Sequence, residues 1–192
     1  AYFSKIGGVG KGPSSNSIIQ NGWAMTGGVT VYNSAVNFSY CNFNESMTED
    51  ALNIISSSFS LDSCTFKNIF SDAFDGDFVQ GEVKNCIFMK VKGDGVDFSG
   101  SQVSVTGCSF SDINDKAISV GEDSYVKVQS TKIDRVSFGV VAKDMSQVIV
   151  NNCKIEQATI AAFSAYQKKN SFGPAKMEVN YSAVVGSANK FL

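Results

Sequence analysis

Acidic residues recur at a fixed distance in the middle of the chain. Asp72 and Asp94 lie 22 residues apart, and Asp75 and Asp97 repeat that spacing within the segments SDAFDGDF and GDGVDFSG. Clustered carboxylates can donate and accept protons in catalysis, and they are ligands that calcium prefers. We therefore ask which structure places these acids side by side.

Composition limits the chemistry available to such a cluster. The chain has 192 residues and no His, which removes the commonest general base and a common zinc ligand. A base must therefore be a carboxylate, Lys, Tyr or Cys. The formal net charge is −2, and Arg135 is the single Arg, so no surface for nucleic acid is expected. No apolar run approaches the roughly 20 residues that span a bilayer, so membrane insertion is not expected.

The acids belong to a repeat that runs through most of the chain. A small residue follows the acidic position at steps of 22, and the series is Ala51, Ala73, Gly95, Ala117, Gly139 and Ala161. Apolar residues two positions apart, separated by Gly, Asn, Asp and Ser, indicate strands and turns. A unit of this length matches one coil of a parallel β-helix. We predict an all-β fold, a single-stranded parallel β-helix (solenoid) with about 22 residues per coil.

The whole chain, residues 1–192, is predicted to form one β-helix domain. Regular coils are expected over 35–167, between irregular N-terminal coils or a cap at 1–34 and a C-terminal coil or cap at 168–192. The sequence is also compatible with a fragment of a larger protein that carries flanking domains. Because uncapped solenoid ends expose strand edges, end-to-end self-association is a further expectation.

The cysteines share one column of the repeat. This column contains Cys41, Cys64, Cys86, Cys108, Thr131 and Cys153. Stacked side chains with parallel Cβ vectors have poor disulfide geometry, and a column does not converge on a metal ion. The cysteines are therefore predicted to be small buried core residues.

Two columns of the repeat contain the acids, and Asp77 adds one more. The first column contains Asp50, Asp72, Asp94 and Lys116, and the second contains Asn53, Asp75, Asp97 and Ser119. Strand alternation predicts that Asp75, Asp77 and Asp97 face solvent, whereas the direction of Asp72 depends on a bend in the chain.

Two interpretations of the acids remain open. Asp before a turn often accepts hydrogen bonds from backbone N–H groups, so the first column can cap solenoid corners. Alternatively, stacked carboxylates repel one another and bind a hard cation, and the candidate calcium patch is Asp50, Asp72, Asp75, Asp77, Asp94 and Asp97. The candidate ligand-binding residues are Asp72, Asp75 and Asp97, and the candidate catalytic residues are Lys116 and Asp94.

The last coils carry apolar residues in the outward column. Val141 and Phe163 are expected to point outward, and Phe163 is a candidate platform for sugar stacking. Lys168 and Lys169 are expected in a solvated turn or at a contact with a polyanion.

Between Val29 and Pro174 the repeats resemble the right-handed parallel β-helix (pectate-lyase-like) superfamily. The segments EDALNI, SDAFDGDF, GDGVDFSGS, DKAISVGE, VVAKDMSQ and AYQKKNSFGPA are most similar to β-helix modules of bacterial and archaeal surface proteins, some joined to spore-coat-type kinase domains. The resemblance implies a right-handed solenoid at the cell surface or outside the cell.

The resemblance to polygalacturonases is incomplete. Asp50, Asp72 and Asp94 are similar to the catalytic column of that family, but its Gly-His-Gly coil and Arg-Ile-Lys motif are missing. The missing motifs argue against a hydrolase.

The resemblance to calcium-dependent pectate lyases implies a different chemistry. The residues that resemble their calcium site are Asp72, Asp75, Asp94 and Asp97. In such a site, calcium would neutralise a uronate carboxylate, and Lys116 or Lys143 would remove the neighbouring proton.

The sequence leaves open whether the chain is an enzyme. The leading hypothesis is a surface or extracellular module that engages polysaccharide, with calcium assisting a pectate-lyase-like activity on uronate polymers. The alternative is a non-catalytic structural or adhesive solenoid module of a larger surface protein or assembly.

Overall fold

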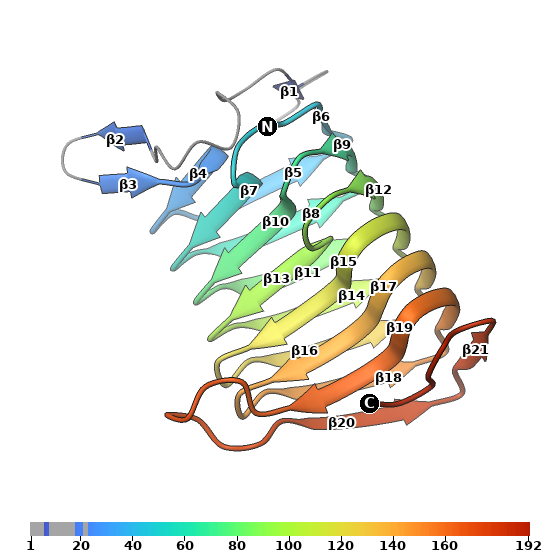
Figure 1. Cartoon of the computed structure of the whole chain (residues 1–192). Helices are drawn as coiled ribbons and strands as arrows, with labels where there is room; N and C mark the ends of the chain where they lie inside the picture. Colours follow the sequence, from blue (N-terminus) through green and yellow to red (C-terminus); the bar gives the residue numbers. More distant parts are fainter. Residues whose placement is uncertain (1–5, 8–17, 21–22) are drawn as a thin grey trace.

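The computed structural model describes residues 6–7, 18–20 and 23–192, with side chains described from Met25 onward. Within this part, parallel strands form a stack of coils (Figure 1). Successive coils pair at steps of about 22 residues, so that Phe74 pairs with Leu52 on one side and Val96 on the other. The predicted all-β parallel solenoid is therefore confirmed.

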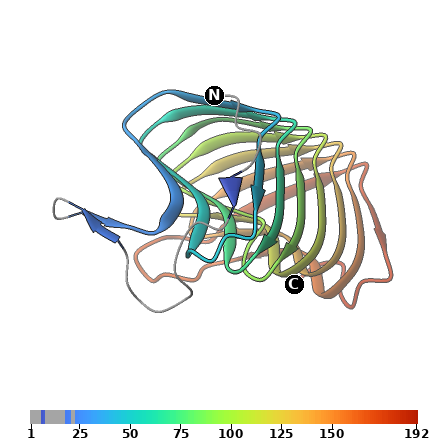
Figure 2. The same cartoon turned by 90° about the horizontal axis from the view of Figure 1, so that it is seen from above.

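Each coil has three sides (Figure 2). Side 1 is a seven-stranded sheet of β5 (Val36–Ser39), β8 (Ser58–Asp62), β11 (Gln80–Lys84), β14 (Gln102–Thr106), β16 (Tyr125–Gln129), β18 (Gln147–Asn151) and β20 (Lys176–Asn180). Sides 2 and 3 belong to one twelve-stranded sheet. Side 2 contains β1 (Ile6–Gly7), β6 (Asn42–Asn44), β9 (Thr65–Ile69), β12 (Ile87–Val91) and β21 (Ala183–Val185). Side 3 contains β4 (Gly27–Tyr32), β7 (Asp50–Ile55), β10 (Asp72–Asp77) and β13 (Val96–Ser99).

Three long strands continue from side 2 around the corner into side 3. They are β15 (Ser109–Gly121), β17 (Lys132–Lys143) and β19 (Lys154–Tyr166). Outside the coils, β2 (Ile18–Gln20) and β3 (Trp23–Met25) form an antiparallel pair. None of the residues that the structure describes belongs to a helix long and apolar enough to cross a membrane.

The coil ladder extends beyond 35–167 at both ends. Strand β4 pairs with β7, and β20 pairs with β18. Part of the expected N-terminal cap, residues 1–5, 8–17 and 21–22, lies outside the described residues.

Short corners connect the three sides because residues with left-handed backbone stand there. In one coil these residues are Phe78, Asn85 and Lys90, with φ of 54°, 52° and 56°. A single residue in this conformation bends the chain sharply, but it costs conformational energy for most residues other than Gly. The ladders on both sides of each corner must therefore hold it in place.

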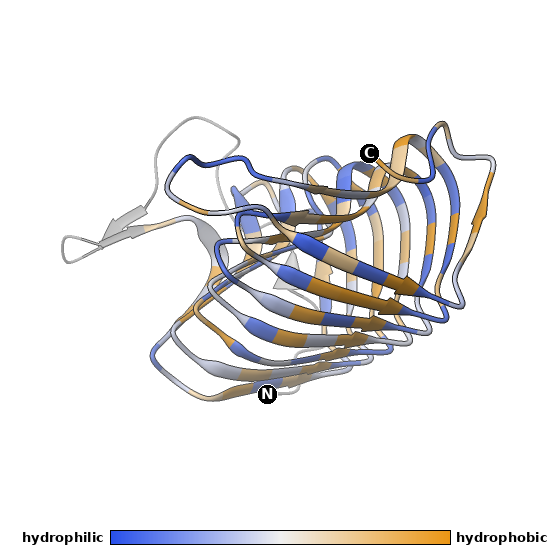
Figure 3. Ribbon diagram, turned by 90° about the horizontal axis from the view of Figure 1, so that it is seen from below, coloured by the Kyte–Doolittle hydropathy of each residue, from blue (hydrophilic) through white to orange (hydrophobic). Residues whose placement is uncertain are grey.

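The interior consists of ladders of like residues. Phe43, Phe66, Phe88 and Phe110 stack with ring centroids 4.4–4.8 Å apart. Figure 3 shows hydrophobic and hydrophilic residues alternating along the strands, as expected when one face of each strand is buried.

The cysteine column lies in the core, as predicted. All five cysteines are free and buried. The backbone N–H of Cys64 donates to Cys86 Sγ at 3.4 Å, and the N–H of Cys108 donates to Thr131 Oγ1 at the same distance. Thr131 can therefore replace a cysteine because its hydroxyl accepts the same hydrogen bond.

The predicted register is wrong in one coil. Phe138 pairs with Ala161 and Val140 pairs with Phe163, so this step is one residue longer than 22. A shift of one residue turns each side chain to the opposite face of a strand. Phe163 is therefore fully buried in the core and cannot be the predicted sugar platform.

Candidate functional site

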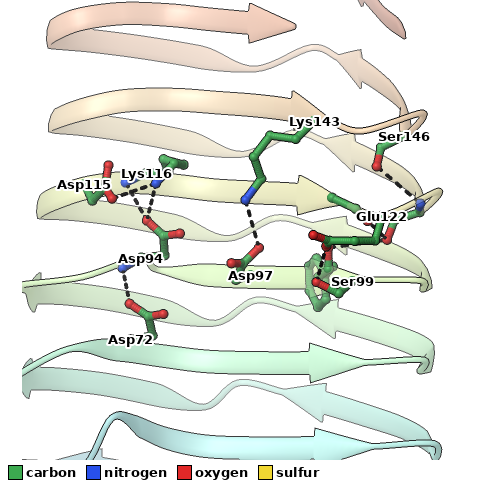
Figure 4. Close-up of polar contacts among 12 residues, drawn as sticks. Asp72, Asp94, Asp97, Ser99, Asp115, Lys116, Glu122, Lys143 and Ser146 are labelled. Carbon is green, nitrogen blue, oxygen red and sulfur yellow. Dashed lines mark hydrogen bonds and ion pairs between the residues drawn. The ribbon is translucent and has the colours of Figure 1, made fainter. Parts of the chain in front are cut away.

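Side 3 brings the sequence-predicted acids together. Figure 4 shows Asp72, Asp94 and Asp97 on neighbouring strands, with Lys116 and Lys143 beside them. We call this surface the acidic face and define it by Asp50, Asp72, Asp75, Asp77, Asp94 and Asp97. In β10, Phe74 and Gly76 are buried, while Asp75 and Asp77 on the opposite face are half-buried. Asp97 also faces outward, and its side chain is 26% exposed, in agreement with the predicted alternation.

Two acids of the first column cap the corner between sides 2 and 3. Asp72 Oδ1 accepts a hydrogen bond from the backbone N–H of Asp94 at 2.7 Å. Asp94 Oδ1 accepts one from the backbone N–H of Lys116 at 2.9 Å. Each carboxylate thus ties its own coil to the next one. The corner-capping interpretation holds for these two residues.

Asp94 is buried and Asp72 is half-buried, which makes their charges costly. Burial raises the pKa of Asp72 to about 6, against the hydrogen bond from the Asp94 backbone that lowers it. Burial raises the pKa of Asp94 to about 7 and outweighs the attraction of Lys116. Asp50 is 4% exposed, and burial raises its pKa to about 6 despite a hydrogen bond with Thr26. The acidic face therefore gains charge between mildly acidic and neutral pH.

The second column contains an acid whose pKa is strongly raised. Burial, followed by the charges of Asp50, Asp77 and Asp97, raises the pKa of Asp75 far above its ordinary value. Asp75 Oδ2 accepts a hydrogen bond from Asn53 Nδ2 at 2.7 Å. Burial also raises the pKa of Asp77, against hydrogen bonds with Asn53 and Asp75 that lower it. Asp75 therefore holds its proton more strongly than an ordinary aspartic acid does.

Asp97 lies opposite a buried lysine from two strands away. Lys143 Nζ is 3.7 Å from Asp97 Oδ1, and the Lys143 side chain is 7% exposed. A Cβ atom at Gly121 would be 3.4 Å from Lys143 Cε, so the lysine passes directly over this glycine of β15. Asp97 Oδ1 and the neighbouring Ser119 Oγ are buried without a hydrogen-bond partner in the described part of the chain.

Lys116, a predicted catalytic residue, is committed to two carboxylates. Its Nζ is 2.6 Å from Asp115 Oδ2 and 3.3 Å from Asp94 Oδ1. Burial lowers the pKa of Lys116, but Asp94 and Asp115 raise it by more, so it lies above its ordinary value. The ammonium group keeps its proton, which disfavours the expected role of Lys116 as a base.

One end of the acidic face adjoins a loop at 167–173. Buried Asp144 accepts hydrogen bonds on Oδ1 from the backbone N–H groups of Lys168 and Lys169, both at 2.6 Å. The Lys169 ammonium pairs with Glu122, which also accepts a hydrogen bond from Ser99 Oγ. Burial raises the pKa of Glu122, but these two hydrogen bonds lower it below its ordinary value. The two lysines thus belong to a turn that is anchored to the coils.

An exposed aromatic residue beside the acids escaped the sequence analysis. Phe78 directly follows Asp77, is 68% exposed and stands at a corner with φ of 54°. A Cβ atom at Gly100 would be 2.6 Å from the Phe78 ring, so the ring lies over this glycine. Other residues at this corner include Asn33, Ser56 and Glu122. The occurrence of a phenylalanine among polar residues at this corner position was therefore the sequence signal that could have identified Phe78.

The other outward apolar residue is not exposed. Val141 pairs with Ser119 and Ser164 and is fully buried. Neither Val141 nor Phe163 therefore contributes an exposed apolar surface next to the acids, whereas Phe78 does.

The calcium patch stays a prediction. Among the residues that the structure describes, no three or more Asp, Glu, His or Cys side chains are grouped so that they could hold a metal ion. Asp72 and Asp94 are engaged with backbone amides, and Asp50 is 4% exposed. Asp75, Asp77 and Asp97 are therefore the members of the patch that calcium could contact.

Comparison with known proteins places these observations in context. No curated protein matches the chain. Among solved structures, the catalytic domain of a GH87 alpha-1,3-glucanase in complex with nigerose is similar, with 10% identity and a TM-score of 0.36. The alignment covers 86% of this chain and 46% of that chain. A structure described as a glycoside hydrolase has 9% identity, a TM-score of 0.35, and coverage of 84% and 38%. This chain thus spans less than half of either structure.

A family model describes the same coils. The model of the right-handed β-helix region matches residues 27–191, which run from β4 to the bridge between Phe163 and Phe191. The match includes every strand of side 3 and therefore the whole acidic face. Together with the parallel coils, it shows that the chain belongs to the right-handed β-helix family.

Proposed function

We propose that the chain is a polysaccharide-binding module that holds a glycan across the acidic face. The observation that carries the proposal is the exposed Phe78 ring, which stands at the corner directly after Asp77 and over Gly100. Sugar rings have an apolar face that packs on aromatic rings and hydroxyl groups that hydrogen-bond to carboxylates. This combination supports recognition of a sugar chain, and it matches the expectation of a surface or extracellular protein.

The charge of the site favours a neutral glycan. The acidic face holds six carboxyl groups, and Lys116 and Lys143 are each already paired with one of them. A uronate polymer would add further negative charge to this surface, which is unfavourable unless a cation is bound. The expected calcium-assisted recognition of uronates is therefore a second possibility, in which Asp75, Asp77 and Asp97 would contact the ion.

Glycan cleavage would use different residues in the two cases. Protonated Asp75 could donate its proton to a glycosidic oxygen, with an ionised neighbour as the base. Calcium-assisted elimination would instead require an uncharged lysine. Lys116 does not supply one, since Asp94 and Asp115 keep it charged. The raised pKa values of Asp75 and Lys116 thus favour proton donation by Asp75 over elimination.

The structural alternative rests on a specific observation. Asp72 and Asp94 bind backbone N–H groups of the next coil, which is a role that stabilises the solenoid without any ligand. A structural or adhesive module would need these two acids but would need neither Phe78 nor Asp75. The two hypotheses therefore differ in the residues on which binding depends.

The test is affinity electrophoresis against a panel of neutral and acidic polysaccharides. Phe78→Ala is expected to weaken binding to the retained glycan roughly tenfold, because a stacking platform is lost. Tyr40→Ala is the matched control, since Tyr40 is also an exposed aromatic residue at a corner, with φ of 56°. Retention of no glycan by the wild-type chain would favour the structural alternative.

Cleavage is tested on the glycan that binds. New reducing ends without absorbance from unsaturated sugars would indicate hydrolysis, and Asp75→Asn should abolish it. Unsaturated products that require calcium would indicate the lyase. Binding without either product would leave a non-catalytic module.

A further inference from the structure

A hollow separate from the acidic face lies at the corner between sides 2 and 3. Its volume is about 520 Å³, which is within the range of small-molecule sites. We call it the corner groove and define it by Met47, Ile69, Phe70, Lys90, Val91 and Lys92. No residue of the acidic face lines it.

The floor of the corner groove is apolar. Ile69 and Val91 are each 1% exposed and belong to the hydrophobic core. Phe70 is half-buried, and Met47 is 38% exposed. The floor thus presents an aromatic ring to solvent on a rigid base, because the core ladders hold the backbone beneath it.

The rim of the groove is positively charged. Lys90 and Lys92 are exposed, and neither forms an ion pair within the described part of the chain. Lys92 Nζ is 4.6 Å from the centre of the Phe70 ring. The acid that lines the groove, Asp112, accepts hydrogen bonds from Arg135 at 2.7 and 3.2 Å, and the same guanidinium also pairs with Asp134. An anion would find the Lys90 ammonium together with the Lys92 ammonium, which lies over the Phe70 ring as a cation–π partner.

We propose that the corner groove binds a carboxylate-bearing sugar residue. The carboxylate would pair with Lys90 and Lys92, and the apolar face of the sugar ring would pack on Phe70. Charge complementarity selects an anion, and the aromatic floor selects a ring with an apolar face. The choice of a sugar rests on the proposed function, whereas the residues and the ligand charge differ from those of the acidic face.

Calorimetric titration with a galacturonate oligosaccharide in the presence of a calcium chelator tests the proposal. Replacing both lysines, Lys90→Gln with Lys92→Gln, is expected to weaken binding roughly tenfold. The matched control is Lys67→Gln with Lys132→Gln, which removes the same charge from exposed positions on side 2. The control should change affinity by less than about twofold. Fully methyl-esterified oligosaccharide should bind at least roughly tenfold more weakly than the acid form.

Three results would overturn the proposal. The first is an equal loss of affinity in the Lys90/Lys92 variant and in the Lys67/Lys132 control. The second is equal affinity for the methyl ester and the acid form. The third is no binding of the acid form by the wild-type chain at millimolar concentration. The variant Asp75→Asn with Asp97→Asn separates the two sites. It should impair a neutral glycan on the acidic face while leaving galacturonate binding at the corner groove unchanged.

Discussion

Lys143 reaches back over Gly121 to lie 3.7 Å from Asp97, although an entire strand separates the two residues. Most ladder contacts in this fold join adjacent coils, whereas this ion pair joins β17 to β13 across β15. Its two charges are largely removed from solvent, and Asp97 Oδ1 has no hydrogen-bond partner in the described chain. The pair is therefore sensitive to loss of either member.

Lys143→Met is expected to destabilise the protein by about 2 kcal/mol at neutral pH, because it leaves a half-buried carboxylate without a counter-charge. Urea unfolding measures the change. Lys154→Met is the control, since Lys154 pairs with Glu156 while remaining 49% exposed. Equal effects of the two substitutions would show that the Asp97 pair has no special role.

Stability is expected to fall as pH rises from 5 to 8. Asp50, Asp72 and Asp94 have folded-state pKa values of about 6, 6 and 7, each above the ordinary value of 3.8. The folded chain therefore retains protons that the unfolded chain releases, and this stabilisation disappears as pH passes through the folded values. The melting temperature should drop by roughly 5 °C over this range.

Asp50→Asn is the variant that checks this explanation. It should reduce the pH dependence, because a neutral amide cannot ionise at this buried position. Asp123→Asn removes the same charge at an exposed corner and should leave the pH dependence of the melting temperature unchanged. If both variants kept the wild-type dependence of melting temperature on pH, groups other than Asp50 would be responsible for it.

Asp94→Ala should cost about 1–3 kcal/mol, because the backbone N–H of Lys116 loses its acceptor. Asp94→Asn should cost less, since its amide oxygen can still accept this hydrogen bond. Thermal unfolding of both variants separates the contribution of the backbone hydrogen bond from that of the negative charge of Asp94. Equal destabilisation by Ala and Asn would assign the effect to the ion pair with Lys116.

The cysteine column should tolerate hydroxyl residues. Cys108→Ser is expected to cost less than Cys108→Ala, because a hydroxyl can donate to the carbonyl that the Cys108 thiol now contacts, at 3.5 Å on Thr106. Reducing agent should leave the melting temperature unchanged, since all five thiols are free. A shift on reduction would indicate a disulfide.

The regular spacing made most of the fold predictable from sequence. Period and strand alternation correctly placed the core phenylalanines, the cysteine column and the outward direction of Asp75 and Asp97. These features depend on a local sequence pattern that recurs in each coil.

The errors occurred where the repeat changes or where side chains reach beyond it. One additional residue before Ala161 shifts Phe163 into the core, and a fixed step of 22 conceals that residue. The Lys143 contact depends on side-chain length and on the space above Gly121, which spacing alone does not show. Phe78 was detectable in principle as an aromatic residue in a polar corner column.

The hydrogen bonds that Asp72 and Asp94 accept from the next coil limit how the acidic face can change in length. Asp72 and Asp94 each accept a hydrogen bond from the backbone N–H at the equivalent position one coil later, so each of these two coils carries its own connection to the next. Duplication or deletion of one complete repeat would preserve these connections, whereas a change of a few residues would break them. The acidic face can therefore be lengthened or shortened only by whole coils.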